Sequence, residues 1–141
     1  MAPAGSPPVP FGISHVVSWP DHLRAVVTRA RVYELSGARA SANPGSVAVL
    51  VRLEITNGTG SEITVNRARL LLWYGAERRP AEEFTDRAAN FGGGFDNTIR
   101  PGGSVVGDYA FVVPRQSVTR LELEFRPRPG DAPGRFVGSA D

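Results

Sequence analysis

Hydrophobic and polar positions alternate with a period of two along most of the chain, and residues 47–56 show this most regularly. Five aliphatic residues of this stretch share one face: Val47, Val49, Val51, Leu53 and Ile55. The opposite face turns polar towards its end, as in a strand that packs on a core by one side only. Residues 57–60, Asn-Gly-Thr-Gly, then form a turn cluster able to take positive φ. We therefore predict a central strand here, with which the other strands pair.

Alternation of the same kind predicts several further strands. They are bounded by Pro, Gly or Asn clusters and lie at residues 11–19, 23–35, 62–74, 105–113, 119–126 and 135–137. Residues 23–35 contain enough Ala and Arg for a helix, but Val, Thr and Tyr favour a strand. A kink is expected at Asn66-Arg67, because the apolar phase shifts there.

The segments between these strands carry weaker patterns. Residues 78–84 could form a weak strand or a helical turn, and residues 36–46 are expected to form a loop. About seven or eight short strands without a helix predict an all-β fold, namely an immunoglobulin-like antiparallel β-sandwich.

The two ends of the chain are rich in Pro and Gly. Residues 1–10 are expected to be a flexible leader or linker, residues 11–126 the sandwich domain, and residues 127–141 a tail with room for one short edge strand. The leader has no basic segment followed by an apolar one, so it is not a signal peptide. Either an export signal or anchor upstream of Met1 has been removed, or this is the natural leader of a cytoplasmic protein.

Composition narrows the class of protein. The 141 residues fit one domain, and no apolar run reaches the roughly 20 residues of a membrane span. All 16 basic residues are Arg, so the high isoelectric point reflects the absence of Lys rather than a large positive field, since the net charge is only +2. With no Cys, the chain has neither disulfides nor thiolate chemistry.

No catalytic signature is present. His15 and His22, with Asp21 beside the latter, are too few for a zinc site, and an exposed turn position is the expected place for them. No G-x-S-x-G occurs, and Glu82 and Glu83 would point to opposite sides of a strand. We therefore expect no enzyme activity, no catalytic residue, no metal site and no cofactor. A cleft that sets a histidine against a carboxylate would reopen the question.

Residues 85–97 are the most irregular stretch. The run Gly92-Gly93-Gly94 lacks the Lys and the helix of a phosphate loop. Four residues could offer oxygens to calcium, but without EF-hand spacing: Asp86, Asn90, Asp96 and Asn97.

Aromatic residues in and near this stretch allow two interpretations. Phe84, Phe91 and Phe95 could anchor the loop on the sandwich, with the glycines easing close packing. Alternatively, an exposed aromatic and arginine patch could bind a protein or glycan, since such residues dominate interface hot spots. The candidate binding residues are Trp73, Tyr74, Arg78, Arg79, Phe91 and Phe95.

Nucleic acid is not an expected partner. Arg24, Arg29 and Arg31 are the best candidates for phosphate contacts, and the last two would share a face of a strand. They have no stacking aromatic neighbours, and Asp21 and Glu34 dilute the field.

Four features in the middle of the chain, taken in order, resemble a known family. They are the long strand ending at Asn57-Gly58-Thr59-Gly60, the segment 70–78 (LLLWYGAER), the segment 101–114 with its Pro-Gly-Gly turn and FVVP strand end, and the strand 121–125. This pattern resembles the DUF4352 group of bacterial extracytoplasmic domains, which is similar in fold to the secreted mycobacterial antigen MPT63. The resemblance implies an immunoglobulin-like sandwich, usually exported as a lipoprotein or secreted protein, with no established catalytic residues.

These observations favour a non-catalytic binding module, exported or on the cell surface, that acts through contact with a partner protein. The alternative is an intracellular structural or accessory subunit that docks into a larger assembly through an edge strand. The contact surface is expected at the loop 85–97 together with the turn 73–79.

Overall fold

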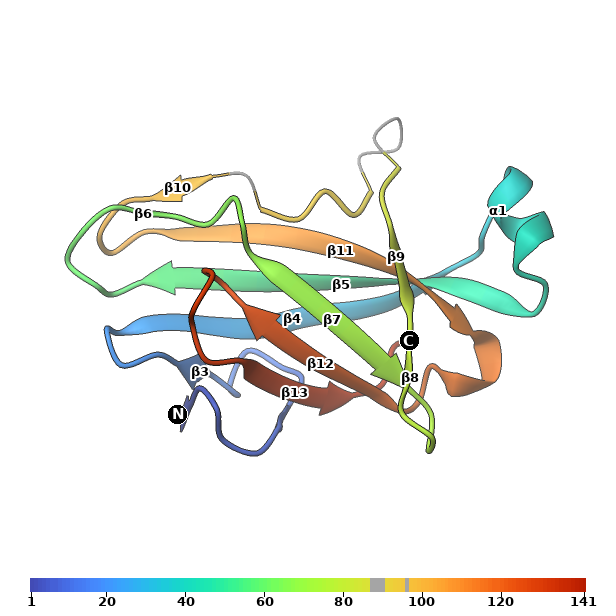
Figure 1. The fold of residues 1–141 in the computed structure, drawn as a ribbon, viewed down its shortest axis with the longest axis horizontal. Coiled ribbons are helices and arrows are strands. Elements are labelled where there is room, and N and C mark those ends of the chain that lie inside the picture. Colours follow the sequence, from blue (N-terminus) through green and yellow to red (C-terminus); the bar gives the residue numbers. More distant parts are fainter. Residues whose placement is uncertain (87–90, 96) are drawn as a thin grey trace.

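The computed structural model describes residues 1–86, 91–95 and 97–141, and these residues form a β-sandwich (Figure 1). Two sheets lie face to face, and the strands of one cross the strands of the other obliquely. The predicted all-β sandwich is therefore confirmed. The described residues form more strand segments than predicted, because several pairings involve only two or three residues.

Sheet A is the larger layer and contains the longest strands. Its order is β1 (Ala2–Pro3), β3 (Val17–Ser18), β4 (Leu23–Tyr33), β5 (Ser46–Asn57), β11 (Ser104–Pro114) and β9 (Glu82–Phe84). Strand β5 pairs antiparallel with β4 on one side and with β11 on the other. The prediction that residues 47–56 form a central strand is confirmed.

Sheet B is the second layer. Its order is β2 (Val9–Pro10), β13 (Gly134–Gly138), β12 (Leu121–Arg126), β7 (Arg69–Tyr74) and β8 (Arg79–Pro80). A separate antiparallel pair joins β6 (Ile63–Thr64) to β10 (Thr98–Ile99). Residues 65–68 separate β6 from β7, which confirms the kink expected at Asn66-Arg67.

The main core fills the space between the two sheets. It receives the alternating face of β5 and the inward residues of β11, β12 and β13. Its largest fully buried side chains include Leu53, Ile55, Phe111, Leu123, Phe125 and Phe136. Strand β4 contributes Leu23, Ala25 and Val27 and then, after a register shift between Val27 and Arg29, Ala30. A β-bulge of this kind exchanges the faces of a strand, so both halves of β4 present apolar residues to the core.

One segment differs from the expected loops. Residues predicted as a loop contain a short helix, α1 (Gly37–Ala42), which buries no residue and has no side-chain N-cap. A 3-10 turn, η1 (Arg115–Ser117), follows β11. Small residues such as those of α1 give no hydrophobic period, which is why the pattern of apolar positions does not reveal the helix.

Both ends of the chain pair with the sheets, whereas a flexible leader and a tail were expected. Residues Ala2–Pro3 pair with β3, and Val9–Pro10 pair with β13. Strand β13 lies between β2 and β12, so it is an inner strand of sheet B. Prolines can take part here because each pairing is only two residues long and lies at a sheet edge.

Residues 79–84 close one side of the sandwich by changing sheet. The chain pairs with β7 through β8, donates a hydrogen bond from the Ala81 amide to the Leu72 carbonyl at 2.8 Å, and then pairs with β11 through β9. The segment predicted as a weak strand is thus two short strands in different layers.

Candidate functional site

The outer face of sheet B presents apolar and charged side chains to solvent in cross-strand rows. Glu122 of β12 lies between Trp73 of β7 and Val137 of β13. In the next row Glu124 lies between Leu71 and Arg135. Opposed residues of an antiparallel pair point to the same side, so these six residues share one surface, here called the sheet B face. Leu71 and Val137 are 39% and 38% exposed.

Arg78 covers the half-buried Trp73 on this face. Its guanidinium carbon lies 4.3 Å from the centre of the Trp73 ring system. Arg78 Nε donates to Glu122 Oε2 at 2.6 Å, and Nη2 donates to Oε1 at 3.3 Å. The hydrogen bonds and the charge of Glu122 raise the pKa of Arg78. The cation is therefore held in place by a ring beneath it and by a two-point ion pair on the neighbouring strand.

The turn between β7 and β8 places Arg78 in this position. The Arg78 amide donates to the Gly75 carbonyl at 3.2 Å, and Arg78 has a φ of 54°. Positive φ is uncommon outside glycine, so Arg78 occupies an unfavourable backbone conformation in this turn. A hollow of about 540 Å³ lies beside it, lined in part by Trp73, Arg78, Glu122 and Val137.

Tyr74 and Arg79 do not belong to the sheet B face. Tyr74 lies opposite Leu121 and packs against the core, because consecutive strand residues point to opposite sides. Arg79 of β8 lies opposite Tyr74 of β7 and forms an exposed ion pair with Glu77 at 2.9 Å. Tyr74 and Arg79 line a separate hollow of about 340 Å³.

Phe91 lies on the other side of the molecule, on the outer face of sheet A. Its ring centre is 5.3 Å from that of Tyr33 and 5.8 Å from that of Phe84. Beneath these rings lie outward-facing residues of β5 and β11 that are nevertheless buried: Ala48, Leu50, Ala110 and Val112. These seven residues form a second, smaller apolar cluster, here called the outer cluster of sheet A.

Gly92 allows the chain to approach this cluster. It has a φ of 79°, and a Cβ at this position would lie 2.8 Å from the Phe84 carbonyl oxygen and 2.9 Å from Ala110 Cβ. A residue with a side chain could occupy neither the conformation nor the space. The alternative in which the glycines ease close packing of the loop is the one that the structure shows.

Phe95 is a core residue, and its assignment to an exposed patch is wrong. It is only 5% exposed, and its ring centre lies 6.0 Å from Tyr109 and 5.9 Å from Phe125. A Cβ on Gly107 would lie 2.8 Å from the Phe95 ring, so the ring sits directly on the backbone of β11. Phe91 and Phe95 thus pack on opposite faces of sheet A.

The predicted aromatic and arginine patch therefore divides into separate places. Only Trp73 and Arg78 lie together on the sheet B face; Tyr74 and Arg79 lie at the edge of the sandwich, Phe91 on sheet A, and Phe95 in the core. Alternation within β7 predicts that Trp73 and Tyr74 point to opposite sides of the strand, but no comparable periodicity predicts the positions of Phe91 and Phe95.

The groups considered for catalysis do not converge in the described part of the chain. His15 and His22 are exposed, and His22 has a φ of 74° in the turn before β4. Glu82 lies opposite Val112 and Glu83 opposite Phe111, on different faces as expected. Partial burial raises the pKa of Glu83, and the charge of Arg69 opposes this shift.

Metal ligands do not gather either, as far as residues 1–86, 91–95 and 97–141 show, because no three His, Asp or Glu side chains come together. Asn90 and Asp96 of the calcium alternative lie outside the described residues. Arg24, Arg29 and Arg31 are all exposed, and the expectation that they do not bind nucleic acid stays a prediction.

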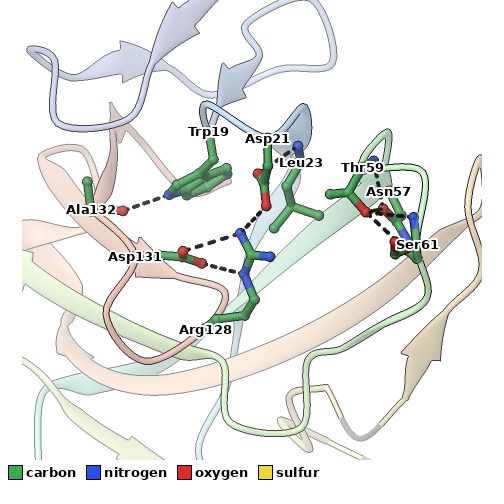
Figure 2. A network of polar contacts seen from close by, with 9 residues as sticks. All are labelled: Trp19, Asp21, Leu23, Asn57, Thr59, Ser61, Arg128, Asp131 and Ala132. Carbon is green, nitrogen blue, oxygen red and sulfur yellow. Dashed lines mark hydrogen bonds and ion pairs between the residues drawn. The ribbon is translucent and has the colours of Figure 1, made fainter.

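A polar network that the sequence pattern did not reveal holds the opposite end of the sandwich (Figure 2). The Asn57 side chain is fully buried; its Nδ2 donates to the carbonyls of Ser61 and Ile99, and its Oδ1 accepts from the Thr59 amide and hydroxyl. Asn57 therefore stabilises this turn through the hydrogen bonds of its side-chain amide. Of the Asn-Gly-Thr-Gly cluster only Gly60 takes positive φ.

Arg128 fastens the segment after β12 to the turn before β4. It pairs with Asp21 at 2.8 Å and with Asp131 at 2.8 Å, and Trp19 Nε1 donates to the Ala132 carbonyl at 2.7 Å. Partial burial acts to raise the pKa of Asp21, but the hydrogen bond and charge of Arg128 and the Leu23 amide outweigh it, so this pKa is lowered. The contacts of Asn57 and of Arg128 connect loops to one another and so have a structural role. The candidate site is therefore the sheet B face.

Within the described residues, no helix has the length and apolar character needed to cross a membrane. No curated protein sequence matches the chain. Several solved structures have the same fold, although low sequence identity means that they establish the fold alone.

One such structure is the predicted lipoprotein ycdA of Bacillus subtilis, at 18% identity and a TM-score of 0.68. The match covers 85% of this chain but 37% of that chain, so the present chain spans little more than a third of the lipoprotein's length. An uncharacterized β-sandwich protein of Clostridium difficile matches at 15% identity and a TM-score of 0.58, over 96% of both chains. The yjhA protein of Bacillus subtilis matches at 14% identity and a TM-score of 0.58, over 100% of both chains.

The sequence itself matches a family model. Residues 21–133 match the family described as domain of unknown function DUF4352. The resemblance noted on residues 57–60, 70–78, 101–114 and 121–125 is thus confirmed, and the likeness to MPT63 stays a prediction. The chain belongs to the DUF4352 family.

Proposed function

We propose that this domain is a non-catalytic interaction module that binds a partner protein through the sheet B face, outside the cytoplasm. The observation that carries the proposal is the Trp73 ring, covered by an arginine that Glu122 holds in place and flanked by exposed Leu71 and Val137.

The chemistry of this face is that of an interface hot spot. Trp and Arg are the residues whose truncation most often weakens protein complexes. Arg78 is already ordered by Trp73 and Glu122, so less side-chain freedom is lost when a partner binds. Its ion pair is exposed and contributes little to stability, so the arrangement is better explained by recognition than by folding.

The family and the similar fold of the ycdA predicted lipoprotein support an extracytoplasmic location. The alternative, an intracellular subunit that docks through an edge strand, has less support. The edge strands β1, β9, β2 and β8 contain only two or three residues each. Such short edges offer few free backbone groups for strand addition.

Photo-crosslinking in source cells tests the proposal. A photoreactive benzoylphenylalanine replaces Val137 on the sheet B face or, as a matched control, Arg100 in the exposed turn before β11. We expect a discrete crosslinked protein from position 137 only, recovered with the envelope and secreted fractions.

Substitutions then connect the adduct to the proposed residues. Trp73→Ala and Arg78→Ala should each abolish the adduct from position 137, whereas Tyr74→Phe, on the opposite side of β7, should leave it unchanged. An adduct that survives both alanine variants, or that forms equally from position 100, would refute the sheet B face as the binding surface.

A further inference from the structure

A small hollow opens beside the outer cluster of sheet A, on the other side of the molecule from the sheet B face. Its volume is about 200 Å³, and its walls include Tyr33, Ala48, Phe84 and Phe91. Sites for drug-sized ligands have about 300–1,000 Å³. The hollow therefore suits a single apolar side chain rather than a whole small molecule.

Arg39 of α1 also lines this hollow and leaves its hydrogen-bonding edge available. Its guanidinium carbon lies 4.2 Å above the centre of the Phe84 ring. Among the described residues no carboxylate forms an ion pair with Arg39. Stacking occupies the face of a guanidinium, whereas its planar N–H fork stays free for the two oxygens of a carboxylate.

The neighbouring strand extends the positive charge. Arg29, Arg31 and Tyr33 occupy alternate positions of β4 on the outer face, opposite Arg52, Leu50 and Ala48 of β5. Arg29 and Arg31 are exposed and have no ion pair with any described carboxylate.

Most of the nearby acidic groups already interact with other residues. Glu34 lines the hollow, but its carboxylate pairs with Arg115 at 2.6 Å, and Asp108 pairs with Arg52 at 2.7 Å. Asp86 also lines the hollow but has an interaction of its own, and Glu82 lies across the sheet on β9. The surface between α1 and β4 therefore carries three arginines that form no ion pair with a described carboxylate, beside an aromatic hollow.

We infer that this surface binds an acidic peptide segment. One apolar side chain of the peptide enters the hollow between Tyr33 and Phe91, an adjacent carboxylate pairs with the free edge of Arg39, and further acidic residues lie along Arg31 and Arg29. The charge of the surface selects an anionic partner, and the size of the hollow selects a single side chain. This site is separate from the sheet B face and does not depend on it.

Selection from a random linear peptide library displayed on phage tests the inference, using the whole chain as bait. We expect enriched peptides with Asp or Glu beside a Leu, Ile, Met or Phe. Enrichment should be lost when Arg39→Gln replaces the bait. Enrichment of basic or uncharged peptides, or of no peptide beyond the level seen with Arg39→Gln, would overturn the inference.

Fluorescence anisotropy with the most enriched peptide, labelled with fluorescein, then measures how much each arginine contributes to the affinity for the peptide. Arg39→Gln should raise the Kd about tenfold or more, the size expected for losing a charge-assisted two-point contact. Arg39→Lys should recover part of this loss, since a point charge cannot reproduce the fork. Arg31→Gln should weaken binding less and flatten its salt dependence. Arg100→Gln, in the exposed turn before β11, should leave the Kd unchanged.

Two controls separate the peptide from other anionic or identical partners. Sedimentation of the chain with phosphatidylglycerol vesicles should show no binding that Arg39→Gln abolishes. Sedimentation velocity should show no dimer that the same variant dissociates. Vesicle binding that Arg39→Gln abolishes would assign the surface to a lipid, and a dimer that Arg39→Gln dissociates would assign it to a second copy of this chain. Each of these outcomes would contradict the inference.

Discussion

Leu50 on the outer face of sheet A is 7% exposed, whereas Leu71 on the outer face of sheet B is 39% exposed. Leu50 is on β5 and Leu71 is on β7, and both point away from the main core. The difference comes from what covers them. On sheet A, Phe91 lies beside Tyr33 and Phe84 over the outer face, while on sheet B no described segment covers Leu71 in this way.

The comparison separates two uses of apolar residues on the outside of a sandwich. On sheet A they stabilise the fold, because the chain supplies its own cover. On sheet B they stay in contact with water, next to a tryptophan and an arginine that are already ordered. Exposed apolar residues of the second kind point to binding rather than folding.

The largest expected effect is a difference in the free energy of unfolding between substitutions at Phe91 and Phe95. Phe95→Ala should lower the free energy of unfolding by about 3–5 kcal/mol, because it removes a buried ring from the core. Phe91→Ala should cost about 1–2 kcal/mol, because that ring is half-buried on the outer face. Urea denaturation followed by tryptophan fluorescence measures both. Equal costs would show that the two rings do not occupy different environments.

A second pair tests whether the loop depends on close approach to sheet A. Gly92→Ala should cost about 2–4 kcal/mol, since it combines a positive φ with a collision against Phe84 and Ala110. Gly93→Ala is the matched control, because a Cβ there meets nothing within 4 Å, and it should change stability by less than about 0.5 kcal/mol. Thermal unfolding of the two variants provides the measurement. A tolerated Gly92→Ala would mean that the loop is not seated on β11.

The smallest expected effect concerns the Arg128 network at the other end of the sandwich. The folded-state pKa of Asp21 is lowered, so the stability contributed by this carboxylate is present above its unfolded pKa. That contribution is lost as the pH falls through the lower, folded value. Because the pair is partly exposed, Arg128→Gln should cost below about 1 kcal/mol at pH 7.

Urea midpoints of wild type and Arg128→Gln, compared between pH 7 and pH 2, check this dependence. The gap between the two proteins should close below the ordinary Asp value of 3.8. A gap that is constant over this range would rule out Asp21 as the titrating partner.

Strand periodicity was sufficient to predict the long elements of the fold. The two faces of β5 and the break before β7 follow from the positions of apolar residues, whereas the register shift between Val27 and Arg29 in β4 was not predicted. Helix α1 and the strands at both ends could not be predicted in the same way, since residues 37–42 have no apolar period and the paired prolines read as a linker.

The candidate site was predictable only in part. Trp73 and Arg78 could be identified as a tryptophan and an arginine beside a turn. Glu122 could not, because alternating charges in residues 120–126 are typical of any solvated strand face, and its contact with Arg78 depends on the register of β7 and β12. Phe95 was misplaced because the glycine run gives no indication of the side of β11 on which each ring lies.

The most direct test of the account is the same substitution made at Leu50 and at Leu71, with the free energy of unfolding measured in urea for both. The account predicts a loss of about 2–4 kcal/mol for Leu50→Ala and below about 1 kcal/mol for Leu71→Ala. Equal losses, or a larger loss at Leu71, would contradict the claim that the chain covers Leu50 on sheet A and leaves Leu71 exposed on the sheet B face.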